Sequence, residues 1–267
     1  MDGSSRDFVA IVAERRGSTG TQNFVGSGGT PVLDLPYGSA GESAPGRLEP
    51  LRPARSRAKR AFDLTVALAL AVLLAPGLLL LALLVRLDSP GPIFYRCRRV
   101  GFGGQPFEML KFRKMHHRAE GAHLTAHADD RFTRAGKWLA RLKADELPQL
   151  WNVLRGDMSL VGPRPESPVF ASHFPQDFDQ ITRVRPGIVG LSQLAFAEES
   201  RILDPNDPTS HYVGRILPQK IALDRMYAER WRFHVDLRVV LWTAAAVLLR
   251  RPVAVDRQTG KMRLRRR

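Results

Sequence analysis

Two adjacent carboxylates, Asp145 and Glu146, are the strongest candidates for chemistry in this sequence. They stand at the start of a run with helical spacing over 146–154, just ahead of Pro148. An acidic pair in this place commonly caps a helix and complements its dipole. A second reading is a carboxylate nucleophile beside a magnesium ligand, since magnesium takes hard oxygen ligands and usually only one or two carboxylates from the protein.

Basic side chains near this pair in the sequence would favour its ionised state. They are Arg141, Lys143, Arg155 and Arg164. Arg164 stands between two stiff prolines that would hold its guanidinium in place, and a guanidinium shares the charge of a phosphoryl group through two hydrogen bonds. The pattern suits a phosphorylated substrate, although the spacing alone leaves the capping reading open.

The chain has 267 residues and a net charge of +15, from 41 Lys and Arg against 26 Asp and Glu. An excess of this size needs a negative partner, such as nucleic acid, anionic lipid or a phosphorylated substrate. Hydrophobic residues form 44% of the chain, which is too many for wholesale disorder. Cys97 is the only cysteine, so a disulfide-stapled secreted fold is excluded.

Residues 64–85 form a run of 22 residues without a charge. Such a run is long enough to cross a hydrocarbon core of about 30 Å at about 1.5 Å per residue. Pro76 lies within it and predicts a bend, because proline removes one helix hydrogen bond and opposes the preceding turn. Basic residues flank both sides, which favours both ends on the cytoplasmic face. A helix that enters and returns and an ordinary kinked transmembrane helix are both open on these observations.

The rest of the chain predicts a mostly α-helical fold with one small β-hairpin. The hairpin joins 93–95 to 107–112 through a glycine-rich turn at 101–106. Helical spacing appears over 133–142, 146–154 and 216–228, and the apolar run 239–249 suits a helix in the membrane interface or in the core. We expect a flexible arm over 1–56, a basic flank and membrane helix over 57–90, a catalytic domain over 91–250, and a basic tail over 251–267, of which 261–267 contact anionic lipid.

Several motifs occur in order along the chain. They are Lys59-Arg60-Ala61-Phe62-Asp63, the apolar run with Pro76, Ser89-Pro90-Gly91-Pro92-Ile93-Phe94, Lys111-Phe112-Arg113-Lys114-Met115, the block 145–165, and Val184-Arg185-Pro186-Gly187-Ile188-Val189-Gly190. Together they resemble the bacterial sugar transferase family, the monotopic polyprenol-phosphate phosphoglycosyl transferases that start lipid-linked glycan assembly. The resemblance runs from residue 59 to about residue 249 and leaves out the first 56 residues.

The resemblance implies a re-entrant helix broken near Pro76, a catalytic domain on the cytoplasmic face of the bacterial inner membrane, and interfacial amphipathic helices. It implies that Asp145 attacks the sugar-bearing phosphate of a UDP-sugar, that UMP leaves, and that undecaprenyl phosphate takes the phosphosugar from the aspartyl intermediate. The product would start exopolysaccharide, capsule or O-antigen assembly. Glu146 is implied as a ligand of Mg²⁺, together with Asp145. The implied substrate-binding residues are Lys111, Arg113, Arg141, Asp157, Arg164 and Arg185.

The chain departs from the family pattern at two places. Ala140 stands where the family often has an arginine, with Arg141 next to it, which puts the phosphate contact there in doubt. Residues 191–197 replace a family stretch that often holds tryptophan and Asn-Gly-Arg, so the accepted sugar is not carried over. The expected partners are a UDP-sugar, undecaprenyl phosphate and anionic inner-membrane lipid, but not nucleic acid, and a homodimer is left open.

A rival reading is a membrane-tethered protein that binds anionic lipid or nucleic acid without catalysis, as the net charge suggests. Against it, the sequence has no recognised nucleic-acid motif, and its basic residues are not interleaved with stacking aromatics. His116, His117, His123 and His127 could hold zinc, but without regular metal spacing we interpret their stretch as a loop over the active site. Cys97 lies among arginines, and we interpret it as incidental.

Overall fold

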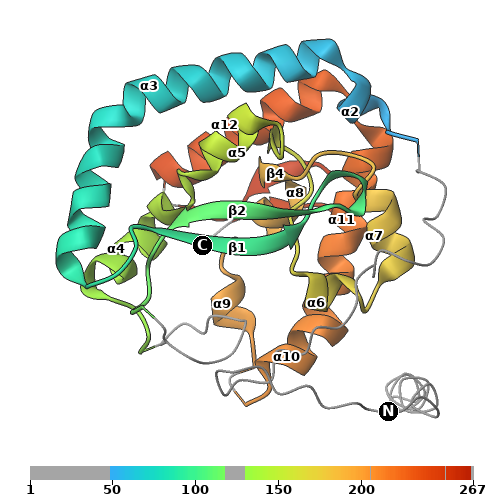
Figure 1. Ribbon diagram of the computed structural model, residues 1–267. Helices are drawn as coiled ribbons and strands as arrows, with labels where there is room; N and C mark the ends of the chain where they lie inside the picture. The colour runs from blue at the N-terminus through green and yellow to red at the C-terminus, as the bar shows by residue number, and fades with distance from the viewer. Residues whose placement is uncertain (1–48, 118–129, 205, 250, 266–267) are drawn as a thin grey trace, which may run out of the picture. The chain divides into compact units, whose positions relative to one another are not determined.

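The computed structural model describes residues 49–117, 130–204, 206–249 and 251–265. Within these ranges the protein is mostly α-helical with three two-stranded sheets, which confirms that part of the predicted fold class (Figure 1). β1 (Phe94–Val100) and β2 (Pro106–Phe112) form the predicted antiparallel hairpin. The 3-10 turn η1 (Phe102–Gly104) joins them, and Gly103 takes a φ of 65° there, which residues with a side chain rarely adopt.

α3 (Arg57–Asp88) is a single helix of 32 residues that contains Pro76. The expected break does not interrupt it, but α3 turns part-way along its length, so that its two arms run in different directions (Figure 1). The first arm packs along α5 (Gln149–Arg155) and β3 (Ser159–Val161). The second arm packs on β2 and on α4 (Arg134–Leu142). A bend of this kind keeps most backbone hydrogen bonds inside the helix.

The outer face of α3 exposes a row of large apolar side chains. Those at least 54% exposed are Leu68, Val72, Leu73, Leu79, Leu80, Leu83 and Leu87. Among the described residues, α3 is the one helix long and apolar enough to cross a membrane, and little of its most apolar stretch is buried in the protein. A contiguous apolar face of this size is suited to lipid contact.

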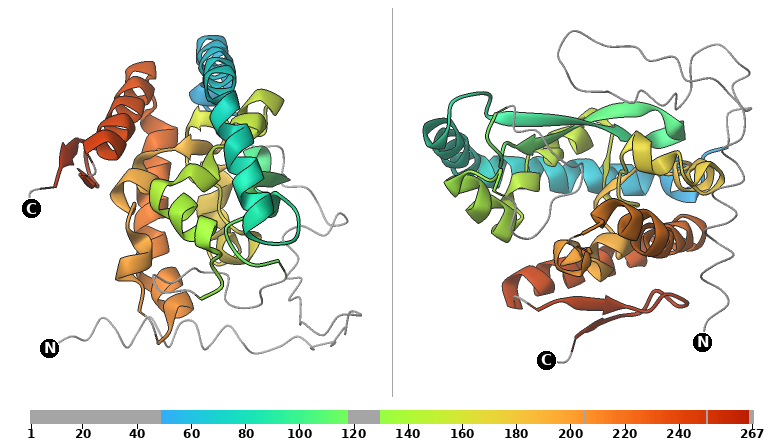
Figure 2. Two further views of the ribbon diagram at one scale, coloured as in Figure 1. Left: turned by 90° about the vertical axis from the view of Figure 1, so that its left-hand side faces the viewer. Right: turned by 90° about the horizontal axis from the view of Figure 1, so that it is seen from below.

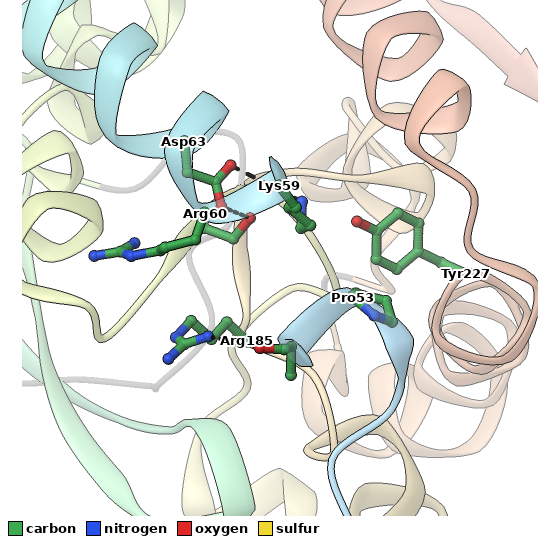
Figure 3. A pocket seen from close by; sticks show the side chains of 8 residues that line it. Pro53, Lys59, Arg60, Asp63, Arg185 and Tyr227 are labelled. Atoms are coloured by element: carbon green, nitrogen blue, oxygen red, sulfur yellow. Dashed lines mark hydrogen bonds and ion pairs between the residues drawn. The ribbon is translucent and has the colours of Figure 1, made fainter. Parts of the chain in front are cut away.

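A buried network of charges fixes the foot of α3 to the rest of the fold, next to a small cavity (Figure 3). Lys59 Nζ lies 2.8 Å from Asp236 Oδ2, and both side chains are almost fully buried. Tyr227 donates a hydrogen bond of 2.7 Å to the other oxygen of Asp236. One turn along α3, Asp63 accepts a hydrogen bond of 2.7 Å from the hydroxyl of Ser159. Because buried charges are tolerated only when paired and hydrogen-bonded, this network determines where α3 begins.

The middle of the chain supplies short elements that surround the acidic pair. α4 starts after Thr133, whose hydroxyl accepts a hydrogen bond from the backbone of Gly136, so the predicted helix at 133–142 is confirmed. The 3-10 turn η2 (Ala144–Glu146) and α5 follow. β3 then pairs in parallel with β4 (Gly187–Val189). The sequence did not predict this pair, because strands of three residues carry too little periodicity.

The remaining helices lead from β3 to the C-terminal half. They are α6 (Pro168–Ala171), α7 (Pro175–Ile181), α8 (Leu191–Ala195), α9 (Glu199–Ile202), α10 (Pro208–His211), the π-helical turn η3 (Tyr212–Ile216), α11 (Leu217–Arg230) and α12 (Phe233–Leu249). α11 confirms the predicted helix at 216–228, and α12 starts six residues before the expected run at 239–249. Val239 is buried in the core, whereas Leu241 and Leu248 are exposed. One face of α12 therefore packs on the core, and the other face exposes apolar side chains.

Both ends of the described chain are more ordered than expected. Residues 1–48 of the expected arm lie outside the described residues, but 49–56 include α2 (Arg52–Arg55) and pack on the core, where Leu51 N donates to Arg183 O at 3.1 Å. The expected basic tail contains an antiparallel hairpin of β5 (Val253–Val255) and β6 (Met262–Leu264). This hairpin lies on the far side of α11 and α12 from α3 (Figure 2). The prediction of an unstructured tail was wrong for residues 253–264, because the alternating apolar residues of this segment pack on the core.

We expect Asp236→Asn to destabilise the protein by about 3–5 kcal/mol, because it leaves the buried ammonium of Lys59 with only the more distant carboxylate of Asp63, 3.9 Å away, among the ion pairs of the described residues. Tyr227→Phe is the matched control in the same network, and the loss of its one hydroxyl should cost about 1 kcal/mol. Denaturant or thermal unfolding in detergent micelles measures both variants. An Asp236→Asn protein as stable as Tyr227→Phe would show that the ion pair does not fix α3.

Candidate active site

Asp145 and Glu146 lie in the turn η2, and not at the start of α5 as the sequence predicted. α5 begins at Gln149, its N-cap is Pro148, and no side chain caps it. The capping reading of the acidic pair is therefore wrong for α5. The chain enters η2 through Lys143, which among the described residues is the one non-glycine with a positive φ, at 57°. Such a conformation is sparsely populated and persists where surrounding contacts hold it, often at functional sites.

Asp145 is only 2% exposed, and its Oδ2 lies 3.4 Å from Lys114 Nζ. Lys114 follows β2, and its backbone lies directly against α4 because Gly136 has no side chain. A Cβ atom at Gly136 would lie 1.8 Å from the carbonyl oxygen of Lys114. Burial lowers the pKa of Lys114, and the charge of Asp145 opposes part of that effect. A buried carboxylate beside a desolvated lysine is a candidate functional group rather than a surface ion pair.

Glu146 directs one carboxylate oxygen at two cations from distant parts of the chain. Its Oε1 lies 2.9 Å from Lys111 Nζ in β2 and 3.6 Å from Arg164 Nη2. Burial alone would raise the pKa of Glu146, but the charges of Lys111 and Arg164 outweigh burial and hold that pKa well below its ordinary value. Glu146 is therefore ionised at neutral pH. We call Lys111, Lys114 and Arg164 the cationic cage of the acidic pair.

The Pro-Arg-Pro segment that carries Arg164 is held by the pairing of β3 with β4. Gly162 and Gly187 let the two strands come so close that a Cβ atom at Gly187 would lie 2.0 Å from the nitrogen of Gly162. The backbone N–H of Gly187 donates to Pro163 O at 2.8 Å, and that of Gly162 donates to Val189 O at 3.0 Å. The chain therefore leaves β3 in a fixed direction, which brings Arg164 to Glu146.

Three other predicted site residues have their described contacts elsewhere. Arg113 donates four hydrogen bonds to the segment 85–90 and so fixes the end of α3. Arg185 donates to the carbonyl oxygen of Gly156 and lines the small cavity at the foot of α3 (Figure 3). Arg141 is exposed in the last turn of α4. Substrate binding by these arginines stays a prediction.

Sequence reasoning missed two residues that build the site, Lys114 and Asn152. Asn152 is 1% exposed and ties α5 to β2, because its Oδ1 accepts from Leu110 N at 3.0 Å and its Nδ2 donates to Glu108 O at 2.8 Å. Its Nδ2 also donates to Asp157 Oδ2 at 3.2 Å, so Asp157 supports this bridge, and its predicted substrate contact stays a prediction. An amide between the apolar residues Trp151 and Val153 of a short helix was the available signal.

The acidic pair is also the best candidate for a metal site in the described part of the chain, where no group of three or more His, Cys, Asp or Glu gathers. Mg²⁺ needs only one or two protein carboxylates when substrate phosphates complete its shell. Within the described part of the chain, the ion pairs of Asp145 and Glu146 use one oxygen of each carboxylate. The second oxygen of each is left for a metal ion, so the two residues fit Mg²⁺. His123 and His127 of the histidine-rich stretch lie outside the described residues.

Asp224 of α11 is a buried carboxyl group behind the Pro-Arg-Pro segment. It is 5% exposed, and its Oδ1 has no hydrogen-bond partner among the described residues. Burial raises the pKa of Asp224 to about 7, although Ser192, Lys220 and the backbone of Arg164 oppose part of that rise. This carboxyl group is therefore poised to change its charge near neutral pH.

Residues 54–250 of the chain match the family described as Bacterial sugar transferase. The chain is also similar to three known proteins. A UDP-glucose:undecaprenyl-phosphate glucose-1-phosphate transferase of Caulobacter vibrioides is 41% identical over 195 residues, which are 71% of this chain and 69% of that protein. A UDP-N-acetylgalactosamine-undecaprenyl-phosphate N-acetylgalactosaminephosphotransferase of Aeromonas hydrophila is 36% identical over 200 residues, 71% of this chain but 43% of that protein. The exopolysaccharide production protein ExoY of Rhizobium meliloti is 34% identical over 218 residues, 75% of this chain and 90% of that protein.

The raised pKa of Asp224 makes stability depend on pH. An acid whose pKa rises on folding, here from 3.8 to about 7, stabilises the folded state below its unfolded pKa and loses this contribution as pH rises through about 7. Asp224→Asn does not titrate, so relative to the wild type it should gain stability, on the order of a few kcal/mol, between about pH 4 and about pH 8. Unfolding in detergent micelles at both pH values measures the difference, and an equal gap at both would contradict the raised pKa.

Proposed function

The chain belongs to the bacterial sugar transferase family and is a phosphoglycosyl transferase, and we propose that it moves a sugar 1-phosphate from a UDP-sugar to undecaprenyl phosphate. The observation that carries the proposal is the buried Asp145–Glu146 pair inside the cationic cage. Two anionic substrates also suit a chain with a net charge of +15. The names of its relatives include both glucose and N-acetylgalactosamine, so the sugar is left to experiment. The product would start assembly of an exopolysaccharide, a capsule or an O-antigen.

Asp145 is the nucleophile in this proposal. One of its carboxylate oxygens attacks the phosphorus that bears the sugar, and the bond from that phosphorus to the bridging oxygen of UMP breaks. UMP leaves with the bonding electrons, and a phosphosugar-aspartyl intermediate, an acyl phosphate, remains. A phosphate oxygen of undecaprenyl phosphate then attacks the same phosphorus, the carboxylate of Asp145 leaves, and a lipid diphosphosugar forms. The covalent step divides one displacement between a bulky diphosphate donor and a bulky lipid phosphate into two smaller ones.

The cationic cage supplies the charge stabilisation that both steps need. Lys111 and Arg164 converge on Glu146, and Lys114 reaches Asp145. In an apo site these cations neutralise the acidic pair, and with a diphosphate bound they would turn to its oxygens, where negative charge builds up in the transition state. The low pKa of Glu146 keeps that carboxylate ionised, so Asp145 has a permanently charged neighbour.

Mg²⁺ is the metal that we propose for this site, held by Glu146 together with Asp145. Bound there, it would neutralise phosphate charge and orient the donor diphosphate. The proposal is supported by Asp145 Oδ1 and Glu146 Oε2, which form no ion pair with the described residues. Lys111 and Arg164 then keep Glu146 ionised, which a metal ligand requires.

We propose that the protein is monotopic, with α3 re-entrant and the catalytic domain on the cytoplasmic face of the inner membrane. Support comes from the exposed apolar face of α3, its turn part-way along, and the basic residues at both of its ends. The open apolar face of α12 suits the membrane interface beside anionic lipid. Such a placement brings the site to the height of the headgroups, where the phosphate of a polyprenol lies. The rival reading, a lipid or nucleic-acid binder without catalysis, leaves the buried acidic pair without a role.

The nucleophile is tested by Asp145→Asn, which should reduce turnover by about a thousandfold or more, because an amide is a far weaker nucleophile than a carboxylate. Asp177→Asn on α7 is the matched control, since Asp177 pairs with Arg225 at the surface, and it should leave turnover unchanged. UMP release from UDP-glucose and UDP-N-acetylgalactosamine with undecaprenyl phosphate measures both variants.

Wild-type enzyme given donor without acceptor should release about one UMP per site as a burst and leave a phosphosugar adduct on the peptide of Asp145. UMP release that depends strictly on acceptor, with no adduct after rapid quench, would overturn the covalent step.

The topology is tested with single cysteines in a Cys97→Ser background. Ser89 is buried and would be shielded by the protein itself, so the better sites are two exposed positions, Ala58 in the first turn of α3 and Tyr95 in β1 beyond its end. A membrane-impermeant thiol reagent should label neither cysteine in intact cells and both after permeabilisation, because both ends of α3 face the cytoplasm. Labelling of one position in intact cells would indicate a spanning helix.

A further inference from the structure

A row of alternating charges runs from the acidic pair into the protein beyond Arg164. Arg164 contacts Glu146 on one side at 3.6 Å. Two residues further along the chain, Glu166 is buried and accepts a hydrogen bond of 2.6 Å from Tyr212 OH. Glu199 stands at the start of α9. Burial by itself would lower the pKa of Arg164, but the charges of Glu146, Glu199 and Glu166 together raise it, so all three carboxylates act on this guanidinium.

Lys220 of α11 is the cation that holds this second group of carboxylates. It is 3% exposed, and its Nζ lies 2.8 Å from Glu199 Oε2 and 3.9 Å from Glu166 Oε2. The same Nζ donates a hydrogen bond of 2.8 Å to Tyr212 OH. A lysine this deeply buried is tolerated only because these partners satisfy it. None of these four residues, Glu166, Glu199, Tyr212 and Lys220, has a part in the transfer steps described above.

The two carboxylates differ in how many other partners they have. Glu166 also pairs with Arg99 at 3.3 Å and accepts a hydrogen bond from Ser167 N at 2.9 Å. Among the described residues, Glu199 forms an ion pair with Lys220, and the side chain of Glu199 is 25% exposed. If Lys220 lost its charge, Glu166 would keep Arg99, whereas Glu199 would lose its ion pair with Lys220 and would attract Arg164, whose pKa it already raises, more strongly. A guanidinium held by Glu199 is no longer free to turn to a phosphate.

We propose that Lys220 is a positioning residue for sugar-phosphate transfer, because its pairing with Glu199 leaves the guanidinium of Arg164 free for Glu146 and for the transferred phosphoryl group. The inference rests on the proposed function, since it requires Arg164 to bind substrate phosphate. It assigns Lys220 no contact with substrate. Without the charge of Lys220, Glu199 competes with Glu146 and the substrate phosphate for Arg164. Removal of the Glu199 carboxylate should therefore restore the activity that is lost with Lys220.

The test is a double-mutant cycle on Lys220→Met and Glu199→Gln. Lys220→Met alone should lower kcat/KM for the UDP-sugar by about tenfold or more, because Glu199 then draws Arg164 away from the phosphate. Glu199→Gln alone should stay within about threefold of the wild type, because the amide carries no charge to compete. The double variant should recover most of the activity lost in Lys220→Met. UMP release from UDP-glucose and UDP-N-acetylgalactosamine with undecaprenyl phosphate in micelles measures all four proteins.

Turnover is expressed per folded enzyme, and unfolding midpoints are measured for each variant, so that a loss of stability is separated from a loss of positioning. Lys220→Gln replaces Lys220→Met in the cycle if the methionine variant does not fold. A double variant as inactive as the single Lys220 variant, while the wild type turns over, would overturn the role of Lys220 and leave the proposed function intact. A wild type that releases no UMP from either donor would overturn both.

Discussion

The fold depends on one buried ion pair, between Lys59 at the foot of α3 and Asp236 in α12, both almost fully shielded from solvent. It joins residues 177 positions apart and recruits Tyr227 and Trp231 as further donors to the carboxylate. A pair of this kind adds little net stability over apolar packing, but breaking it leaves an uncompensated charge in the core. The pair therefore specifies how α3 is placed against α12, so that α3, with its exposed apolar face, extends from the catalytic domain at a fixed point.

The site is assembled from three short pieces of chain. β2 and the residues after it bring two lysines, the turn η2 brings the acidic pair, and the segment after β3 brings Arg164. Glycines set the two closest approaches, at Gly136 under Lys114 and at Gly162 against Gly187. Because each piece is positioned by backbone contact, the backbone that carries the cations is in place before any substrate arrives, so the cations need only change their side-chain direction.

Charge neutralisation is layered around Arg164. The acidic pair and Lys111 form the inner layer, and Glu166, Glu199 and Lys220 form the outer one. Each added carboxylate in a buried site needs a further cation, since an unpaired charge there is costly. A row of alternating charges follows, and it links the reactive groups to α9 and α11, which lie next to the region where the chain departs from the family pattern at 191–197.

The sequence by itself determined the elements whose signals are local. The hairpin at 94–112, the helices α4 and α11, the apolar helix with Pro76, and the acidic pair with its Pro-Arg-Pro partner all followed from periodicity, turn residues and motif order. Only the tertiary structure decided that the acidic pair sits in a separate turn ahead of α5, and that Lys114 joins the site while Arg113 fixes the end of α3. It also decided that 253–264 form a hairpin on the core. The physical reason is that these outcomes depend on which distant backbone a side chain meets, and spacing along the chain carries no information about that contact.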